Sequence, residues 1–209
     1  SRTLVGNPVG EMLVQMMVQS AAGGAGEALG RIAAGEKVNW EMISRPPHGW
    51  NLSGTDLIAT LKRQGEEYLL LVLEHRYPIR GYVVSFPGGI DEEGDGTKGA
   101  LRELKEETGY TALPQDVVAV GPLVYVDPWK SNEKSKFVQV NVREDLPENQ
   151  NPTQNLDPLE VIEALLVKKH CLLEELNKIS QERNCGIDSR LYAFAMGIYL
   201  GQMAQEARP

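Results

Sequence analysis

The sequence predicts an α/β fold in which a mixed β-sheet is flanked by helices, with an appendage at the N-terminus. Three observations support it. Residues 68–73 form a continuous apolar run, which is typical of a strand buried on both faces. Residues 97–108 have helical spacing and turn Ala100, Leu101 and Leu104 inward. A last helix begins after Asp188, a good N-cap, and has a broad apolar stripe that belongs in a core or an interface.

The other elements of the domain follow from alternation and short apolar runs. Residues 56–62 place Leu57, Ala59 and Leu61 on one face of a strand. Further strands are expected at 83–86, 117–126, 137–142 and 160–166, and a further helix at 168–179. A polar loop rich in Asn and Pro, residues 146–157, precedes the last of these strands.

Residues 1–54 are expected to form the appendage, and residues 55–209 the main domain. Within the appendage, Val9, Met12, Leu13, Met16 and Met17 have the spacing of an amphipathic helix. A joint rich in Ala and Gly, residues 21–26, and a short strand at 38–43 come next. The helix is expected to dock on the core or on a second subunit. The segment has no basic flank, so a secretory signal is not expected.

Composition limits the functional class. The 209 residues carry a formal net charge of −8, which argues against a nucleic-acid backbone as partner. A nucleotide is compatible with that charge, because a bound metal supplies local positive charge. Two cysteines fit a reducing, intracellular and cytoplasmic location. The absence of a run of about twenty apolar residues means that no membrane span is expected.

The most informative segment is a Gly-rich turn followed by an acidic helix. Glu103, Glu106 and Glu107 stand at i, i+3 and i+4 and therefore share one helical face. Three like charges repel, whereas Mg²⁺ or Mn²⁺ favours such oxygen ligands and often shares them with substrate phosphate. The alternative is a solvated helix face with Gly109 as a C-cap. That alternative leaves the acids beside the Gly-Gly turn unexplained.

This segment resembles the Nudix box, G-x5-E-x7-R-E-U-x-E-E-x-G-U, in which U is apolar. The second half matches without a gap at Arg102, Glu103, Leu104, Glu106, Glu107, Gly109 and Tyr110. The first half departs, because Gly94 stands where the pattern has Glu, flanked by Glu93 and Asp95. The resemblance implies a Nudix-type α/β/α sandwich. It also implies Mg²⁺, replaceable by Mn²⁺, held by Glu103, Glu106, Glu107 and the carbonyl of Gly88.

Outside the box, the chain resembles the Nudix branch of ADP-sugar pyrophosphatases that act on ADP-ribose. The matching pieces lie between residues 36 and 200: Trp40-Glu41 with Arg45, residues 75–78 before Gly81-Tyr82, residues 86–89, 127–128, 131–134 and 188–192. The resemblance implies Mg²⁺-dependent hydrolysis of the pyrophosphate of ADP-ribose or a related ADP-sugar to AMP and a sugar phosphate. It also implies a homodimer in which N-terminal segments reach across.

The same resemblance implies a set of substrate-binding residues: Trp40, Glu41, Arg45 and Arg76. Trp40 would stack on adenine, and its alternative is an ordinary half-buried strand Trp. Arg76 would bind a substrate phosphate with its planar guanidinium, and its alternative is a surface salt bridge. No aromatic residue precedes Trp40, which weakens the case for a two-sided adenine sandwich unless Trp50 or Trp129 contributes.

The catalytic residues expected from the resemblance are Glu160, Glu106 and Arg102. Glu160 ends the polar loop, and a carboxylate from this loop would orient or deprotonate the attacking water. Glu163 is the competing residue, since alternation along a strand turns the two to opposite faces. Arg102 is expected to brace the carboxylates rather than touch substrate.

Two alternatives stay open at this point. One is a Nudix enzyme for another nucleoside diphosphate derivative, such as a dinucleotide or another nucleotide sugar. The other is a catalytically inactive nucleotide-binding protein, suggested by the missing Glu at Gly94.

Overall fold

The computed structural model describes residues 13–15, 42–44, 53–91 and 94–207. Contacts divide the chain into two units, Ser1–Ser53 with Leu123–Ser135, and Gly54–Pro122 with Lys136–Pro209. In the first unit, β1 (Leu13–Gln15) pairs in antiparallel fashion with β2 (Met42–Ser44). The second unit contains the helices and most of a larger sheet.

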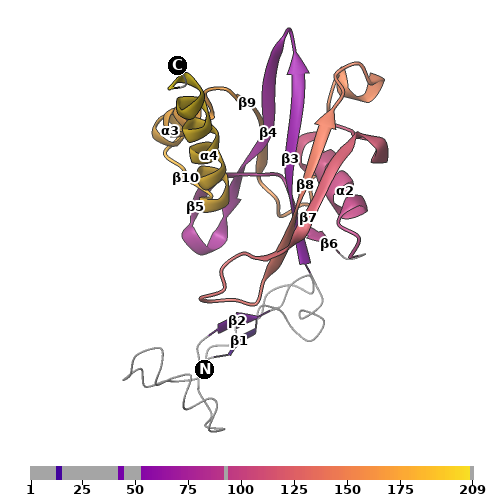
Figure 1. Cartoon of the computed structure of the whole chain (residues 1–209). Helices are drawn as coiled ribbons and strands as arrows, with labels where there is room; N and C mark the ends of the chain where they lie inside the picture. Colours follow the sequence, from indigo (N-terminus) through magenta and orange to yellow (C-terminus); the bar gives the residue numbers. More distant parts are fainter. Residues whose placement is uncertain (1–12, 16–41, 45–52, 92–93, 208–209) are drawn as a thin grey trace. The chain divides into compact units, whose positions relative to one another are not determined.

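The larger sheet is mixed and has the order β10-β5-β4-β3-β8-β7, with β6 on β3 and β9 on β4 (Figure 1). The β10–β5 pair is parallel, whereas β4 is antiparallel to β3, β5 and β9. The strands are β3 (Ser53–Arg63), β4 (Glu66–Arg76), β5 (Gly81–Ser85), β6 (Ile90–Asp91), β7 (Val117–Tyr125), β8 (Lys134–Val142), β9 (Ile162–Lys168) and β10 (Gly186–Ile187).

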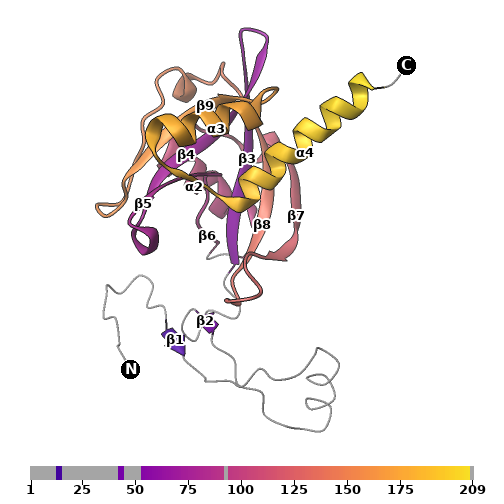
Figure 2. The same cartoon turned by 90° about the vertical axis from the view of Figure 1, so that its left-hand side faces the viewer.

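Three α-helices cover the sheet: α2 (Thr97–Thr108), α3 (Leu172–Arg183) and α4 (Ser189–Glu206). The helix α2 lies on one face, and α3 and α4 lie on the other (Figures 1 and 2). Short 3₁₀ turns are η1 (Tyr77–Ile79), η2 (Pro114–Asp116) and η3 (Pro147–Asn149). None of the helices in the described ranges is long and apolar enough to cross a bilayer.

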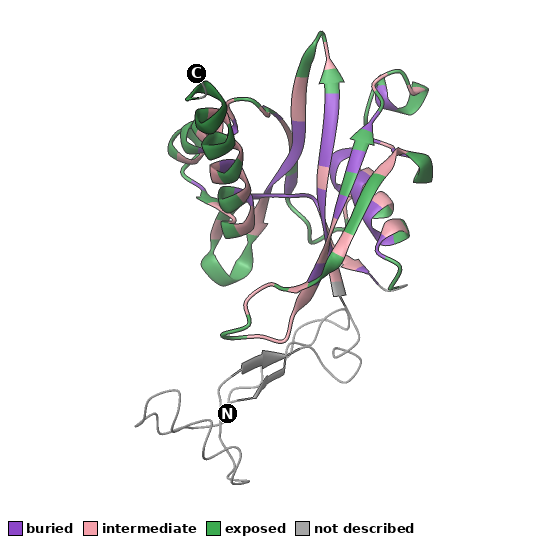
Figure 3. Ribbon diagram, in the orientation of Figure 1, coloured by how far each residue is buried: buried purple, intermediate pink, exposed green. Residues whose placement is uncertain are grey.

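The strand β4 forms the centre of the domain. It pairs with β9 from Tyr68 to Glu74 along one edge, and with β3 and then β5 along the other. Successive side chains of a strand point to opposite faces. Leu70 therefore joins the core under α2, while Leu69, Leu71 and Leu73 join the core under α3 and α4. Figure 3 shows the resulting burial along the middle of β3 and β4.

The expected α/β/α sandwich with a mixed sheet is confirmed, and α2 has the predicted bounds. The Asp188 side chain accepts a hydrogen bond of 2.9 Å from the Arg190 backbone N–H, so the predicted N-cap of the last helix is also confirmed. Gly109 adopts φ 77° and ends α2, so the glycine C-cap that belonged to the alternative interpretation of this helix is present.

Three local expectations need correction. Leu13–Gln15 is a strand rather than part of a helix, because these residues pair with β2, a partner distant in sequence. The rest of the expected helix, and residues 38–41 of the strand expected at 38–43, lie outside the described residues. The strand expected at 160–166 begins at Ile162, because Glu160 closes a turn on Asp157. The helix expected at 168–179 begins at Leu172, since Lys168 still pairs with Tyr68.

Candidate active site

The Gly88–Gly89 turn follows β5 and packs tightly against β3 and α2. The Leu57 N–H donates to the Pro87 carbonyl, and the Thr55 N–H donates to the Gly89 carbonyl, each at 2.8 Å. A Cβ at Gly88 would lie 2.0 Å from the Thr55 carbonyl oxygen, and one at Gly89 would lie 2.1 Å from Glu103 Oε1. Gly88 therefore requires glycine, because the clash is with backbone, whereas a Cβ at Gly89 would displace the Glu103 carboxylate. The turn thus lies directly beside the acidic face of α2.

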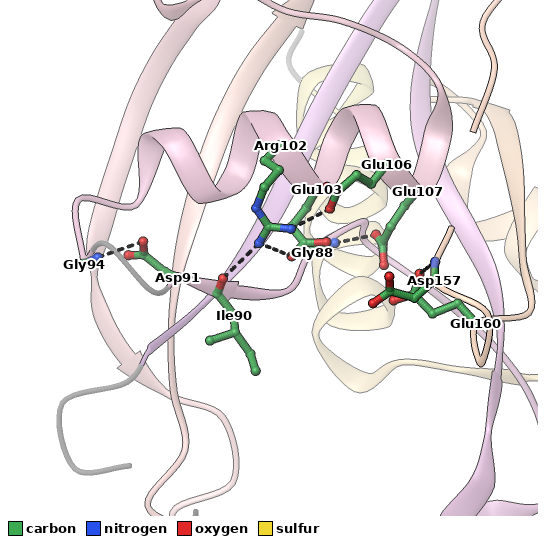
Figure 4. A network of polar contacts seen from close by, with 10 residues as sticks. All are labelled: Gly88, Ile90, Asp91, Gly94, Arg102, Glu103, Glu106, Glu107, Asp157 and Glu160. Carbon is green, nitrogen blue, oxygen red and sulfur yellow. Dashed lines mark hydrogen bonds and ion pairs between the residues drawn. The ribbon is translucent and has the colours of Figure 1, made fainter. Parts of the chain in front are cut away.

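The acidic face of α2 is organised by two donors (Figure 4). The Gly88 N–H donates to Glu107 Oε2 at 2.8 Å. Arg102 donates to Glu103 Oε1 at 2.7 Å, to the Glu106 carboxylate and to the Ile90 carbonyl. Glu103 and Glu107 are buried, at 9% and 4% exposure. Arg102 thus contacts two of the three acids.

Burial of the α2 acids disfavours their charged forms. The pKa of Glu107 is raised well above its usual range, first by burial and then by Glu103, Glu74 and Glu160, against the Gly88 hydrogen bond. The pKa of Glu103 is raised by burial, which outweighs the opposing charge and hydrogen bond of Arg102. The protein thus holds carboxylates whose ionised forms would gain from a cation.

A further carboxylate, Glu74 on β4, belongs to this site and was missed by the sequence analysis. The pKa of Glu74 is raised, first by burial and also by the charge of Glu160, against the opposing charge of Arg76. Arg76 Nη2 lies 2.6 Å from Glu74 Oε2, so Arg76 has the salt bridge that was its alternative interpretation. The Arg76 side chain remains 51% exposed, which leaves room for a second anion. Glu74 gave little signal in the sequence, because it is a single acid directly after the apolar run at 68–73.

Glu160 lies in a turn rather than in a strand, and this separates it from Glu163. Its backbone N–H donates to the Asp157 carbonyl, and its Oε2 accepts from the Asp157 N–H, both at 2.9 Å. Glu160 contributes to the raised pKa values of Glu107, Glu103 and Glu74, so its charge lies near all three. Glu163 instead pairs with Arg183 of α3.

The loop that ends at Glu160 is attached to the C-terminal turn of α2. The Asn155 N–H donates to the Glu106 carbonyl at 2.9 Å. The Gln154 side-chain amide donates to the carbonyls of Glu107 and Ile162. These two residues were also missed by the sequence analysis, because a polar loop has no period that reveals which amide reaches the helix.

Two aspartates bond the backbone around Gly94, the residue that this chain has where the Nudix box has Glu. Asp91 is 2% exposed, and its two oxygens accept from the Gly94 and Gly96 N–H groups, each at 2.9 Å. Asp95 Oδ1 accepts from the Thr97 and Lys98 N–H groups at 2.8 and 3.0 Å. Asp95 therefore caps α2, and Asp91 keeps the loop closed without a carboxylate at Gly94.

Three of the residues expected to bind substrate, Trp40, Glu41 and Arg45, lie outside the described residues. Among the described residues, no three Asp, Glu, His or Cys side chains are arranged so that they could together hold a metal ion. Arg102 contacts oxygens of Glu103 and Glu106 that such an ion would need. The available donors are oxygens, and the burial of Glu103 and Glu107 favours a cation beside them, so the residues present suit Mg²⁺ or Mn²⁺.

Comparison with known proteins gives a consistent match to one family. The NUDIX domain model matches residues 52–185, more than half of the chain. The chain is 36% identical over 162 residues to nudix hydrolase 2 of Caenorhabditis elegans, covering 76% of this chain and 71% of that protein. It is 32% identical over 172 residues to the ADP-ribose pyrophosphatase of Saccharomyces cerevisiae, with coverages of 80% and 73%.

One more relative agrees with this match, and one solved structure has a similar fold. The chain is 30% identical over 167 residues to the ADP-sugar pyrophosphatase of Mus musculus, covering 78% of this chain and 75% of that protein. A crystal structure of an ADP compounds hydrolase has a TM-score of 0.54 at 16% identity, covering 100% of this chain and 94% of that one. The last similarity concerns the fold alone.

Proposed function

Because this chain belongs to the Nudix family of hydrolases, we propose that it hydrolyses the pyrophosphate bond of ADP-ribose or of a related ADP-sugar. The products are AMP and a sugar phosphate. The names of the yeast and mouse relatives, at 32% and 30% identity, support this substrate class. The matching segments outside the box, which include Arg76, support the same class.

The observation that carries the proposal is the pair of buried carboxylates, Glu103 and Glu107, beside the Gly88–Gly89 turn. Buried acids without a full set of compensating charges destabilise a fold, so their position calls for a ligand. A divalent cation with a diphosphate is the ligand that suits oxygen donors on one helical face.

Mg²⁺ or Mn²⁺ would be held by Glu103, Glu106, Glu107 and the Gly88 carbonyl, where it would neutralise the diphosphate and activate water. The chain's own residues supply the rest. The Gly88 N–H fixes Glu107, and Arg102 orients Glu103 and Glu106. Arg76 binds a phosphate oxygen through the exposed part of its guanidinium. Trp40 stacks on adenine, and Glu41 and Arg45 also bind the substrate.

Glu160 acts as the general base in this proposal. Its carboxylate takes a proton from water as the water oxygen bonds to one phosphorus, and the bond from that phosphorus to the bridging oxygen breaks. The proximity of its charge to Glu103 and Glu107 supports this role over Glu163, which pairs with Arg183. A group in a loop can close on bound substrate.

The deciding experiment measures AMP release from ADP-ribose in millimolar Mg²⁺, in Mn²⁺ and in chelator. A substrate panel with NADH, a diadenosine polyphosphate and GDP-mannose runs in parallel. We expect metal-dependent AMP release with the highest kcat/KM for ADP-ribose or an ADP-sugar. Faster hydrolysis of another panel member would assign a different Nudix substrate. Binding of ADP-ribose by calorimetry without turnover in either metal would assign a nucleotide-binding protein instead.

A further inference from the structure

The hairpin between β4 and β5 contacts the Glu160 loop on both sides of Glu160. The Tyr77 hydroxyl donates to the carbonyl of Leu159 at 3.3 Å. The His75 backbone N–H donates to the carbonyl of Val161 at 3.1 Å. The residues immediately before and after Glu160 are thus each bonded to the same hairpin.

The Tyr77 ring is itself oriented by the hairpin. It lies edge-on to the His75 ring, with centroids 5.0 Å apart and an interplanar angle of 82°. Tyr77 stands at the start of η1, where Pro78 restricts the backbone, and the turn closes through the Arg80 N–H and the Tyr77 carbonyl at 3.2 Å. The hydroxyl is therefore presented from a well-defined position, although the side chain is 64% exposed.

We propose that Tyr77 is a positioning residue for Glu160, which it holds toward the α2 carboxylates through the Leu159 carbonyl. The proposal rests on the proposed function, in which Glu160 is the base. Asn155 and Gln154 attach the earlier part of the loop to α2. The turn from Asp157 to Glu160 lies beyond these bonds and is contacted by the hairpin. A base displaced by a fraction of an ångström loses efficiency without changing how substrate binds.

The Tyr77→Phe variant tests this, because it removes the hydroxyl and retains the ring against His75. The matched control is Tyr82→Phe, since the Tyr82 ring also lies edge-on to His75 at 5.3 Å and its hydroxyl makes no hydrogen bond within the described residues. We expect Tyr77→Phe to lower kcat about threefold to tenfold, the effect of one hydrogen bond, with KM within about twofold. Tyr82→Phe keeps the wild-type values.

A double-mutant cycle with Glu160→Gln identifies the route of the effect. If Tyr77 acts through Glu160, Tyr77→Phe lowers kcat in the wild type and causes no further loss in the Glu160→Gln background. An equal loss in both backgrounds, or no loss in the wild type, overturns the positioning role. Wild-type turnover by the Glu160→Gln variant also overturns the positioning role. The proposed function is judged separately, by AMP release from the wild-type protein.

Hydrogen exchange gives a readout that is independent of activity. The Glu160 amide donates to the Asp157 carbonyl, so its exchange reports opening of that turn. We expect faster exchange over residues 157–161 in Tyr77→Phe than in Tyr82→Phe, with unchanged exchange in α3. Unchanged exchange over 157–161 overturns the proposal even for a protein that hydrolyses no substrate.

Discussion

The Gly88 backbone N–H donates a 2.8 Å hydrogen bond to Glu107 Oε2, which links the glycine turn to the last turn of α2. This bond opposes the burial that raises the pKa of Glu107 without cancelling it. Glu107 therefore remains in a position that a cation would stabilise.

We expect Glu107→Gln to lower kcat/KM for ADP-ribose at least about a hundredfold, or roughly 3 kcal/mol of transition-state stabilisation. In chelator the same variant should melt at a higher temperature than the wild type at neutral pH, because it removes an uncompensated buried carboxylate. Steady-state kinetics and thermal unfolding measure the two effects. Glu182→Gln, an exposed acid of α3, is the control. Near-wild-type turnover by Glu107→Gln at saturating Mg²⁺ would falsify the site assignment.

The different surroundings of Glu160 and Glu163 predict different kinetics. Glu160→Gln should lower kcat with little change in KM, because its proposed role is in the chemical step. Glu163→Gln should leave kcat unchanged, since this carboxylate pairs with Arg183 on α3. Turnover and substrate titrations on the two purified variants measure this. The reverse result would transfer the role of base to Glu163.

Restoring the Glu of the Nudix box at Gly94 is expected to bring no gain in activity. Gly94 has φ 77°, a conformation that costs a residue with a Cβ about 1 kcal/mol. We expect Gly94→Glu to lower the melting temperature slightly and not to raise kcat, because Asp91 and Asp95 already hold the loop. A several-fold rise in turnover would show instead that the missing carboxylate limits the enzyme.

The comparison variant for this loop is Asp95→Ala. It removes the acceptor for the Thr97 and Lys98 N–H groups, and loss of such a cap costs about 0.5–2 kcal/mol. Thermal unfolding of Asp95→Ala should therefore show a clear destabilisation without any change of backbone conformation.

The start of α4 predicts a pH dependence of stability. Burial by itself raises the pKa of Asp188, but the hydrogen bonds and charge of Arg190 outweigh it, so that pKa lies below its usual value. A carboxyl with a lowered pKa in the folded state stabilises the fold above its unfolded pKa, near 4, and loses this contribution as pH falls through the folded pKa.

We expect Asp188→Asn to lower the free energy of unfolding by about 1–2 kcal/mol at pH 7, because Asn retains the cap but not the charge. The difference from the wild type should shrink below about pH 4. Urea unfolding across that range measures it. A constant difference from pH 7 to pH 2 would mean that the charge of Asp188 has no part in stability.

Exposed apolar residues on α4 support the expected homodimer. Leu200 is 57% exposed and Met203 is 49% exposed, and both lie in the C-terminal half of α4. We predict twice the monomer mass by light scattering at micromolar concentration, and a lower mass for Leu200→Glu. Glu182→Gln is again the control. A monomeric wild type would contradict this prediction.

Elements whose structure is determined locally could be predicted from the sequence. Helix α2 could be predicted to its end residues because three inward apolar residues and Gly109 define it. The inward set Leu57, Ala59 and Leu61 could be predicted because alternation has a period of two. Strand β1 could not be predicted, since the segment Leu13–Gln15 is too short to show either period, and its pairing with β2 makes it a strand.

The site was predictable in part for the same reason. Glu103, Glu106 and Glu107 share a helical face whatever the rest of the chain does. Glu74 reaches this face through the packing of β4, and Gln154 and Asn155 donate from a loop to backbone carbonyls at the end of α2. No local pattern encodes these contacts. Glu160 and Glu163 could not be separated by alternation, because the strand begins after Glu160.

The strand β4 has a consequence for how the chain can vary. Because Leu70 faces one core and its two neighbours face the other, inserting one residue within β4 would turn the β4 side chains beyond the insertion to the wrong core on both faces. Changes in length are therefore tolerable at the hairpin ends, around Gln64–Gly65 and Tyr77–Arg80, where the backbone already turns. The second of these ends carries the contact to the Glu160 loop, so variation in that hairpin alters the active site while leaving both cores intact.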